Sequence, residues 1–294
     1  MSREAAFEPE RVREFSFTDA DFEALRTLAR ELTGIALAES KRELVYGRLS
    51  RRLRVLGLRS FVDYRRLLEA DDGAELGEFC NAMTTNLTAF FRESHHFDYL
   101  RDEFLLPRMN DPRASRRIRI WSAACSSGEE AYSLAMTICE TIPDLPRWDV
   151  KILATDIDSD ILGRARRGRY AADRVKGLDP LRLQRFFRQV NDGAQRCYEV
   201  DPLIAGMVTF KVLNLMKELP MKGPLDVVVC RNVIIYFDKD AQRDLFGRIA
   251  RVQRPNDLLF LGHSESLFKV SNDYTLIGKT IYRRNGSTVP GAIP

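Results

Sequence analysis

The stretch IRIWSAACSSGEEAYSL, residues 118–134, decides the fold. Its apolar beginning is typical of a buried strand, the small residues after it are typical of a tight turn, and the acidic pair opens a segment with helical periodicity. A strand, a turn and a helix in this order form the corner at which many α/β sheets bind nucleotides. Because ligands of such sheets bind where the strands end, we expect the loop 123–128 to border a binding site.

The same alternation continues toward the C-terminus. Helical patterns follow the apolar runs at 128–141, 159–167 and 239–251. The runs predicted as strands are short and apolar on both sides, and they cover 118–122, 150–155, 225–230 and 258–262. This alternation predicts an α/β protein with a doubly wound, mostly parallel sheet and right-handed crossovers.

Two further segments are predicted to be antiparallel. Thr280–Arg284 is β-like and has no helix after it, which favours an antiparallel edge strand. Between about 168 and 212 the alternation stops, and Gln195–Val200 and Met207–Leu213 are β-like around the turn 191–193. We interpret this region as a small antiparallel β insertion.

The N-terminal part of the chain has helical periodicity instead, beginning with Thr18 or Asp19 as an N-cap. Residues 87–109 also look helical and lead to a turn at 110–112. The expected organisation is a flexible N-terminus at 1–14, a helical domain at 15–85, a linking helix and turn at 86–112, the sheet domain at 113–285 with a β-subdomain at about 168–212, and a flexible tail at 286–294.

The composition is that of an ordinary globular protein, with 30% charged and 45% hydrophobic residues. With no apolar run at the N-terminus and no stretch of about 20 apolar residues, we expect no secretory signal and no membrane insertion. We also expect a cytoplasmic protein that is a monomer. The five scattered cysteines are expected to be reduced. The three histidines have no ligand spacing with each other or with the cysteines, so we expect no metal site.

The net charge of +4 conceals a basic segment, because residues 41–66 alone sum to +7. Apolar residues recur there at roughly helical spacing, namely Leu44, Leu49, Leu53 and Leu56. The arginines that cluster on another side are Arg48, Arg51, Arg52 and Arg59. A solvated helix surface and a docking face for an acidic partner both fit this pattern. Aromatic residues suited to stacking on bases are sparse near these arginines, which gives little support to nucleic-acid binding.

The loop after the first strand disfavours a phosphate ligand. It holds one glycine and no lysine, and Glu129 and Glu130 follow it, whereas a pyrophosphate requires bare backbone N–H groups and positive charge. S-adenosylmethionine has a sulfonium, an ammonium and a ribose diol, and no phosphate. Asp156, at the end of the second strand, could accept hydrogen bonds from ribose hydroxyls. Glu129 could equally be an acidic residue that stabilises the helix dipole.

The methyl acceptor is suggested by what the strand 225–237 lacks. It has no Asn/Asp-Pro-Pro-aromatic motif, as in DNA amino-methylating enzymes, and Cys230 looks buried and does not follow a proline. No His or Lys lies there as an obvious base. An acceptor that is already an anion, such as a carboxylate, needs no base, so the site has to supply positioning. Tyr236 could orient the acceptor or the sulfonium, and it could equally be a core tyrosine.

The sequence resembles the chemotaxis receptor methyltransferases of the CheR family. The stretches that carry the resemblance follow the family order and span nearly the whole chain: TTNLTAFFRESHHF (84–97), WSAACSSGEEAYSLA (121–135), ATDIDSDILGRARRGRY (154–170), FKVLNL (210–215), LDVVVCRNVIIYFDK (225–239) and LLFLGHSES (258–266). The resemblance implies a class I methyltransferase fold and methylation of receptor glutamates by S-adenosylmethionine. The products would be γ-glutamyl methyl esters and S-adenosylhomocysteine.

The resemblance also implies roles for individual residues. The positions expected to bind the cofactor are Asn86, Thr88, Arg92, Glu129, Asp156, Asn214, Leu215, Arg231 and Asn232. Among them Arg92 would pair with the methionine carboxylate, Glu129 would meet the ammonium and Asp156 would hold the ribose. Tyr236 is expected beside the reacting methyl group and Arg108 near the sulfonium. The arginine face, Arg48, Arg51, Arg52 and Arg59, would dock the glutamate-bearing helices of the methyl-accepting receptors.

Two other functions remain open from the residues alone. The fold does not fix the substrate, so an RNA or a small molecule could be the methyl acceptor. A signalling protein that binds S-adenosylmethionine without catalysis is the second alternative. The insertion at 168–212 resembles the family's β-subdomain, which in some members grips a peptide at the receptor C-terminus, but it carries no clear signature of that role.

Overall fold

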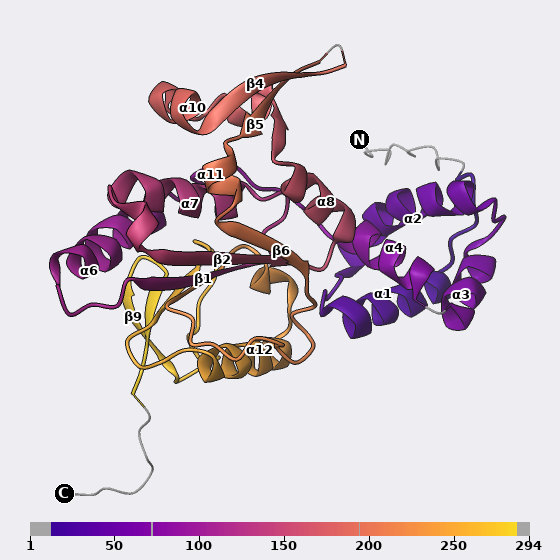
Figure 1. The fold of residues 1–294 in the computed structure, drawn as a ribbon. Helices are drawn as coiled ribbons and strands as arrows, with labels where there is room; N and C mark the ends of the chain where they lie inside the picture. The colour runs from indigo at the N-terminus through magenta and orange to yellow at the C-terminus, as the bar shows by residue number, and fades with distance from the viewer. Residues whose placement is uncertain (1–12, 72, 194, 287–294) are drawn as a thin grey trace, which may run out of the picture.

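The computed structural model describes residues 13–71, 73–193 and 195–286, and a helical domain lies beside an α/β domain (Figure 1). The flexible ends expected at 1–14 and 286–294 lie almost wholly outside these residues. A seven-stranded sheet has the order β6-β2-β1-β7-β8-β10-β9, and a three-stranded sheet has the order β3-β5-β4. The predicted doubly wound, mostly parallel sheet with an antiparallel insertion is therefore confirmed.

Five neighbouring strands of the large sheet run parallel, and their carboxyl ends share one edge. Their bounds are Val208–Val212 (β6), Asp149–Asp156 (β2), Arg117–Ala123 (β1), Val227–Cys230 (β7) and Leu258–Leu261 (β8). The register places Trp121 of β1 between Leu153 of β2 and Val228 of β7. Trp121 is fully buried, as expected for the central strand of a sheet covered on both faces.

Both edges of the large sheet differ from the prediction. β10 (Ile281–Arg284) is antiparallel as expected, but β9 (Tyr274–Gly278) pairs beyond it and forms the edge. β6 was expected in the insertion, and it instead pairs in parallel with β2. A short β-like run does not specify its partner strand, so its pattern fits an edge strand and a hairpin equally well. The insertion contains β3 (Arg169–Ala171), β4 (Phe187–Asp192) and β5 (Gln195–Val200).

Helices cover both faces of the large sheet. In Figure 1, α7 (Glu129–Thr141) lies above the sheet and α12 (Lys239–Arg251) lies below it. Alternate residues of β1 belong to two separate hydrophobic clusters, Ile120 to the α7 side and Trp121 to the α12 side. The remaining helical segments of this domain are η3 (Leu145–Arg147), α8 (Ser159–Arg167), α9 (Ala172–Val175), α10 (Pro180–Phe186), α11 (Pro202–Ala205) and η4 (Ile234–Tyr236).

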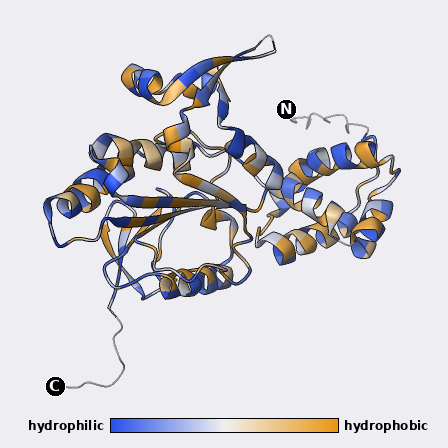
Figure 2. Ribbon diagram, in the orientation of Figure 1, coloured by the Kyte–Doolittle hydropathy of each residue, from blue (hydrophilic) through white to orange (hydrophobic). Residues whose placement is uncertain are grey.

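The N-terminal domain has a hydrophobic core of its own, and Figure 2 shows apolar and polar residues mixed along its amphipathic helices. Thr18 caps α1 as predicted, since its side chain accepts from the Asp21 N–H and the Asp21 carboxylate accepts from the Thr18 N–H. The bounds of the domain's elements are α1 (Asp19–Thr33), η1 (Glu39–Lys41), α2 (Arg42–Leu56), α3 (Phe61–Ala70) and α4 (Ala74–Met83).

Two of the four leucines that the sequence analysis assigned to the apolar face of α2 do not lie on its buried face. Leu49 and Leu53 are buried as predicted, together with Val45, which is one helical turn before Leu49. Leu44 and Leu56 are exposed instead. The buried residues are spaced by four, which is the repeat that keeps side chains on one face of a helix.

The segment between the two domains is not helical where the sequence suggested a helix. Residues 84–94 form an extended and turning strap, and Phe91 and Glu93 have positive φ values of 51° and 58°. Such values are incompatible with a continuous right-handed helix, so α5 begins at His95. From there α5 (His95–Tyr99), the π-helical segment η2 (Leu100–Leu105) and α6 (Leu106–Asn110) lead to β1. In the described part of the chain, no helix has both the length and the apolar character needed to cross a membrane.

Candidate active site

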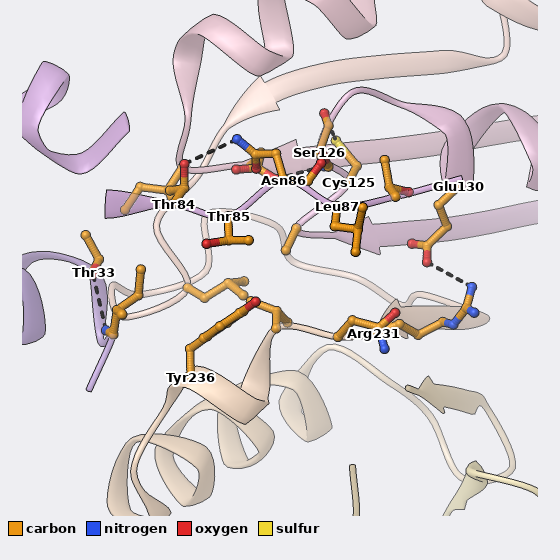
Figure 3. A pocket seen from close by; sticks show the side chains of 18 of the residues that line it. Thr33, Thr84, Thr85, Asn86, Leu87, Cys125, Ser126, Glu130, Arg231 and Tyr236 are labelled. Carbon is orange, nitrogen blue, oxygen red and sulfur yellow. Dashed lines mark hydrogen bonds and ion pairs between the residues drawn. The ribbon is translucent and has the colours of Figure 1, made fainter. Parts of the chain in front are cut away.

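A pocket opens at the carboxyl ends of the parallel strands, where the two domains meet (Figure 3). Its walls come from the loops that follow β1, β2, β6 and β7, from the strap 84–94 and from the connection between α1 and α2. The predicted cofactor residues that line it are Asn86, Thr88, Arg92, Asp156, Asn214, Leu215, Arg231 and Asn232, and Tyr236 lines it as well. Nearly the whole predicted set therefore meets in one cavity.

The loop after β1 is held in an uncommon backbone conformation. Ala124 and Ser126 have positive φ values of 60° and 51°, and Gly128 follows at 94°. A Cβ at Gly128 would also lie 3.0 Å from the Ala165 side chain and 3.2 Å from the Tyr170 hydroxyl, so both space and backbone favour glycine. Strained backbone of this kind concentrates at functional sites, where the surrounding structure holds it in place.

Asp156 is the acidic residue at the end of β2, and it is buried in the pocket wall. Its Oδ2 accepts from the Ser126 N–H at 2.8 Å and its Oδ1 from the Asp158 N–H at 3.0 Å. Burial raises the pKa of Asp156, and these backbone donors partly offset that effect. The two hydrogen bonds fix the orientation of the carboxylate at the pocket surface.

Asp158 was not predicted, and it fastens the strap to the sheet domain. Its Oδ2 accepts from Asn86 Nδ2 at 2.7 Å and from Thr84 Oγ1 at 2.8 Å, while Oδ1 caps α8. The amide nitrogen of Asn86 is thereby committed to Asp158. Asn86 thus helps to shape the pocket by holding the strap in place.

The two glutamates of the GEE motif have different environments, and the prediction chose the wrong one. Glu129 is fully buried, outside the pocket lining, and its carboxylate accepts from Ser127 and Arg174. Glu130 lines the pocket instead, accepting from Ser122 Oγ at 2.6 Å and from Arg231 Nη1 at 3.1 Å. Neighbouring residues of a helix point about 100° apart, so only one of the pair can face the cavity.

Arg231 is a buried cation that joins three segments of the site, and Figure 3 shows its pairing with one of them, at Glu130. It pairs with Glu130 and, through Nη2 at 3.3 Å, with Glu93 of the strap, and it also donates to the Arg92 carbonyl. Burial alone would raise the pKa of Glu93, but the Arg231 charge and the hydrogen bonds from His263 and Asn232 lower it to about 2. Arg231 therefore stabilises two carboxylates that would otherwise be costly to bury.

Tyr236 ends a short turn whose backbone is held from several sides. The buried Glu265 carboxylate accepts from the N–H groups of Asn232, Val233 and Ile234, at 2.8–2.9 Å. The carbonyl of Tyr236 accepts from the Ala36 N–H at 2.8 Å, which links the turn to the helical domain. In Figure 3 the Tyr236 side chain rises from η4 into the pocket.

Asn214 and Leu215 follow β6 and form the wall nearest the helical domain. The Asn214 side chain donates to the Leu32 carbonyl at 2.6 Å and accepts from the Met216 N–H at 2.8 Å. Both domains thus contribute to this wall.

Arg108 is not brought into the pocket, and the expectation that it lies near the reacting centre is wrong. It is located on α6 at the opposite edge of the sheet, where its Nη2 pairs with the buried Asp226 at 3.1 Å. Its guanidinium also lies 4.3 Å from the centre of the Phe104 ring. No motif surrounded Arg108 in the sequence, and its role in the structure is to pair with a buried carboxylate.

Two residues of the arginine face are bound to other parts of the protein, and the other two are exposed to solvent. Arg48 donates to the carbonyls of Ala82 and Met83 and to Thr85, which lines the pocket. Arg52 pairs with the buried Glu75 and with Glu78. The two residues whose side chains remain exposed to solvent are Arg51 and Arg59.

The chemistry of the pocket fits S-adenosylmethionine. Two carboxylates, Asp156 and Glu130, match a ribose diol and an ammonium group, and Arg92 and Arg231 supply positive charge for a carboxylate. The Nε of Arg231 is buried without a hydrogen-bond partner among the described residues. The one-glycine loop offers no phosphate cradle. Fold and pocket together define a class I S-adenosylmethionine-dependent methyltransferase.

Comparisons with known proteins place the chain more narrowly. Residues 86–283 match the CheR methyltransferase S-adenosylmethionine-binding domain, and residues 20–84 match the all-alpha domain of the same family. The chain therefore belongs to the CheR methyltransferase family. It is 43% identical to a chemotaxis protein methyltransferase of Escherichia coli, with 91% of each chain covered. It is 45% identical to chemotaxis protein methyltransferase 2 of Pseudomonas aeruginosa, over 92% of this chain and 94% of that one.

The two glutamates of the GEE motif should be separable by mutation. We expect Glu130→Gln to weaken binding of S-adenosylhomocysteine by roughly 10-fold to 100-fold, because a charged acceptor for the ammonium is lost. Glu129→Gln, its matched control, should change this affinity less than about threefold, since Glu129 lies outside the pocket lining. Isothermal titration calorimetry on both variants measures the difference, and equal losses of affinity would contradict the assignment.

Proposed function

We propose that the protein transfers the methyl group of S-adenosylmethionine to glutamate side chains of chemotaxis receptors and forms γ-glutamyl methyl esters. The observation that carries the proposal is the match to chemotaxis protein methyltransferases over nine-tenths of the chain. The makeup of the pocket supports a carboxylate acceptor. Among the described residues, its lining contains no histidine and no lysine that could remove a proton.

A buried thiol does not supply the missing base. Cys125 lines the pocket, but burial, followed by the nearby Asp156 and Glu130 carboxylates, raises its pKa well above the ordinary value. The thiol therefore stays protonated at neutral pH and is a poor nucleophile. A glutamate acceptor is ionised at this pH and needs neither a base nor a covalent intermediate.

The residues of the chain have to bind and orient the two reactants. When bound, S-adenosylmethionine supplies a methyl group activated by a positively charged sulfur. Asp156 and Glu130 would hold the ribose and the ammonium, and Arg92 the methionine carboxylate. The Tyr236 hydroxyl would orient the incoming carboxylate, as it reaches the same cavity from the opposite wall (Figure 3). One C–S bond breaks and one C–O bond forms, and no proton is transferred.

The reaction is tested by labelled methyl transfer to receptor-containing membranes, followed by mild base. Label released as volatile methanol is expected, because a carboxyl methyl ester hydrolyses under these conditions. Base-stable label would mean transfer to nitrogen or carbon and would refute the glutamate proposal. Cofactor binding without any labelling of the receptor would favour a different acceptor or a binding protein without catalysis.

In this proposal the receptor helices carry many acidic residues, and the exposed arginines Arg51 and Arg59 attract them. We expect Arg51→Glu with Arg59→Glu to raise the KM for the receptor by about tenfold, because attraction becomes repulsion. The affinity for S-adenosylhomocysteine should not change, since neither residue lines the pocket.

The matched control for docking is Arg113→Glu with Arg116→Glu, which makes the same change of charge near the opposite edge of the sheet. Arg52 is not replaced, because it pairs with the buried Glu75 and its loss would lower the stability of the protein as well as the affinity for the receptor. Steady-state methylation at several salt concentrations measures the effect. An equal rise of KM in test and control variants would mean that overall charge, and not this face, governs docking.

A further inference from the structure

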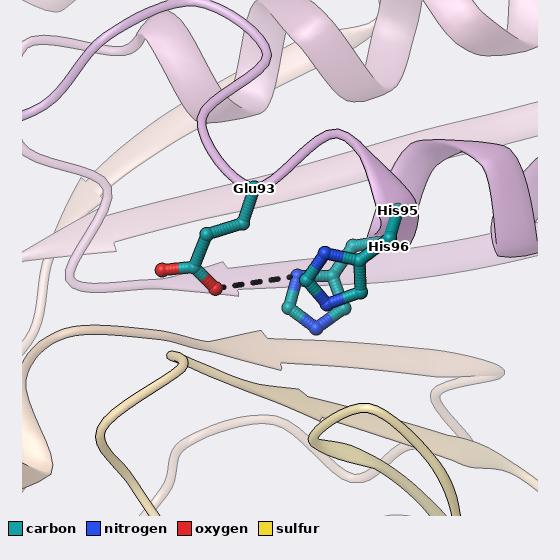
Figure 4. A group of neighbouring side chains, drawn as sticks. All are labelled: Glu93, His95 and His96. Carbon is teal, nitrogen blue, oxygen red and sulfur yellow. Dashed lines mark ion pairs between the residues drawn. The ribbon is translucent and has the colours of Figure 1, made fainter.

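All three histidines of the chain lie around one carboxylate beside the cofactor pocket, and two of them, His96 and His263, are paired with it. His263 Nδ1 lies 3.1 Å from Glu93 Oε1, and His96 Nδ1 lies 3.7 Å from Glu93 Oε2. Figure 4 shows the Glu93 side chain reaching toward the neighbouring rings of His95 and His96. One ligand atom from each of Glu93, His95 and His96 lies within 4.8 Å of the other two. This cluster has no part in the proposed methyl transfer.

Two buried atoms of the cluster face each other without hydrogen-bond partners. They are Glu93 Oε2 and His96 Nδ1, and the His96 side chain is 1% exposed. At 3.7 Å, a proton on Nδ1 would make no hydrogen bond to Glu93.

One tautomer of His96 leaves a free lone pair on Nδ1. His96 Nε2 lies 3.2 Å from Thr280 Oγ1, and in this tautomer the hydroxyl oxygen accepts the Nε2 proton. His95 Nε2 lies 3.1 Å from the Lys279 carbonyl, which can only accept, so His95 also keeps its proton on Nε2. A neutral imidazole with its second nitrogen hydrogen-bonded to an oxygen is the form in which histidine binds metals.

We propose that Glu93, His95 and His96 form a binding site for a divalent transition metal ion of the zinc or nickel class. Two imidazoles and one carboxylate are a ligand set that these ions accept, with water completing the coordination. Ligands about 2.0–2.2 Å from zinc lie roughly 3.3–3.6 Å apart in a tetrahedral site, close to the observed 3.7 Å between Glu93 and His96. A cation between these atoms would give both lone pairs a partner.

The nearest charges set the strength of the site. Arg231 Nη2 lies 3.3 Å from Glu93 Oε2, so a bound dication would share this carboxylate with a guanidinium. That repulsion weakens binding, and we expect a dissociation constant on the order of micromolar. The His263 side chain is 66% exposed, and the Glu93 side chain next to it is 11% exposed.

The test is a titration of tag-free protein with Co²⁺, which substitutes for zinc and absorbs visible light when bound by nitrogen and oxygen ligands. We expect one saturable site per chain, with Zn²⁺ displacing Co²⁺. Glu93→Gln and His95→Ala should each weaken Co²⁺ binding by at least about tenfold, since each removes a ligand. His95 is only partly buried, so its variant remains informative if Glu93→Gln fails to fold.

His263→Ala is the comparison variant, because it removes an exposed imidazole that contacts Glu93 Oε1 without being one of the three proposed ligands. Its affinity for Co²⁺ should fall less than that of His95→Ala, because His263 supports a ligand and does not bind the ion itself. The proposal is overturned if no saturable Co²⁺ binding occurs at millimolar concentrations. It is also overturned if His263→Ala abolishes binding while His95→Ala does not, because the ion would then be held by a surface imidazole.

Discussion

Replacing Arg231 with methionine is expected to lower the free energy of unfolding by about 3–5 kcal/mol, the usual cost of removing one partner from a buried ion pair. Methionine fills most of the same volume and cannot pair with Glu93 or Glu130, which lie on either side of the guanidinium. Both carboxylates would then be buried next to an apolar side chain. The loss of charge pairing, and not a cavity, therefore dominates the effect.

Urea unfolding followed by circular dichroism measures this loss. Arg147→Met is the control, since Arg147 forms an exposed ion pair with Asp144 and should cost less than about 1 kcal/mol. Adding Glu93→Gln to Arg231→Met should recover part of the stability, because one unpaired charge is removed. Equal stability of the Arg231 and Arg147 variants would show that the buried cluster is not held by charge.

The parts of the site that follow directly from a strand end were predictable. Asp156 comes at the end of a buried apolar run, and strand ends of a parallel sheet share one edge. Arg231 and Asn232 also follow a buried run, but their place in the site was implied by the family resemblance. The helices α8 and α12 have the bounds that their periodicity predicted. Local pattern suffices here, because each of these features depends on residues that are close in the sequence.

The remaining features depend on packing between segments far apart in the chain. Glu265 holds the loop of Asn232 from 33 residues away, and Arg174 pairs with Glu129 from 45 residues away. Which of Glu129 and Glu130 faces the pocket depends on the rotation of α7 about its axis. The few residues around the motif do not define that rotation. The histidines likewise have no metal-ligand spacing along the chain, although His263 and His96 meet at Glu93 in space.

Replacing Asp156 with alanine is expected to weaken binding of S-adenosylmethionine by about 100-fold or more. In the proposed complex the carboxylate accepts two hydrogen bonds from the ribose, and each bond to a charged acceptor is worth about 1.5–3 kcal/mol. The fold should persist, although the N–H groups of Ser126 and Asp158 lose their acceptor. Asp160→Ala, on the exposed first turn of α8, is the control and should bind normally.

A comparison of KM with kcat then tells how Asp156 acts. The ribose is separated from the transferred methyl group by the sulfonium, so Asp156 should contribute binding energy equally to the ground state and the transition state. At saturating S-adenosylmethionine the variant should therefore recover a kcat within about threefold of the parent, while its KM stays high. Unchanged cofactor affinity in Asp156→Ala would refute the ribose assignment. A kcat that stays low at saturation would mean that the loop from Ala124 to Ser126, which Asp156 anchors, positions the reacting methyl group.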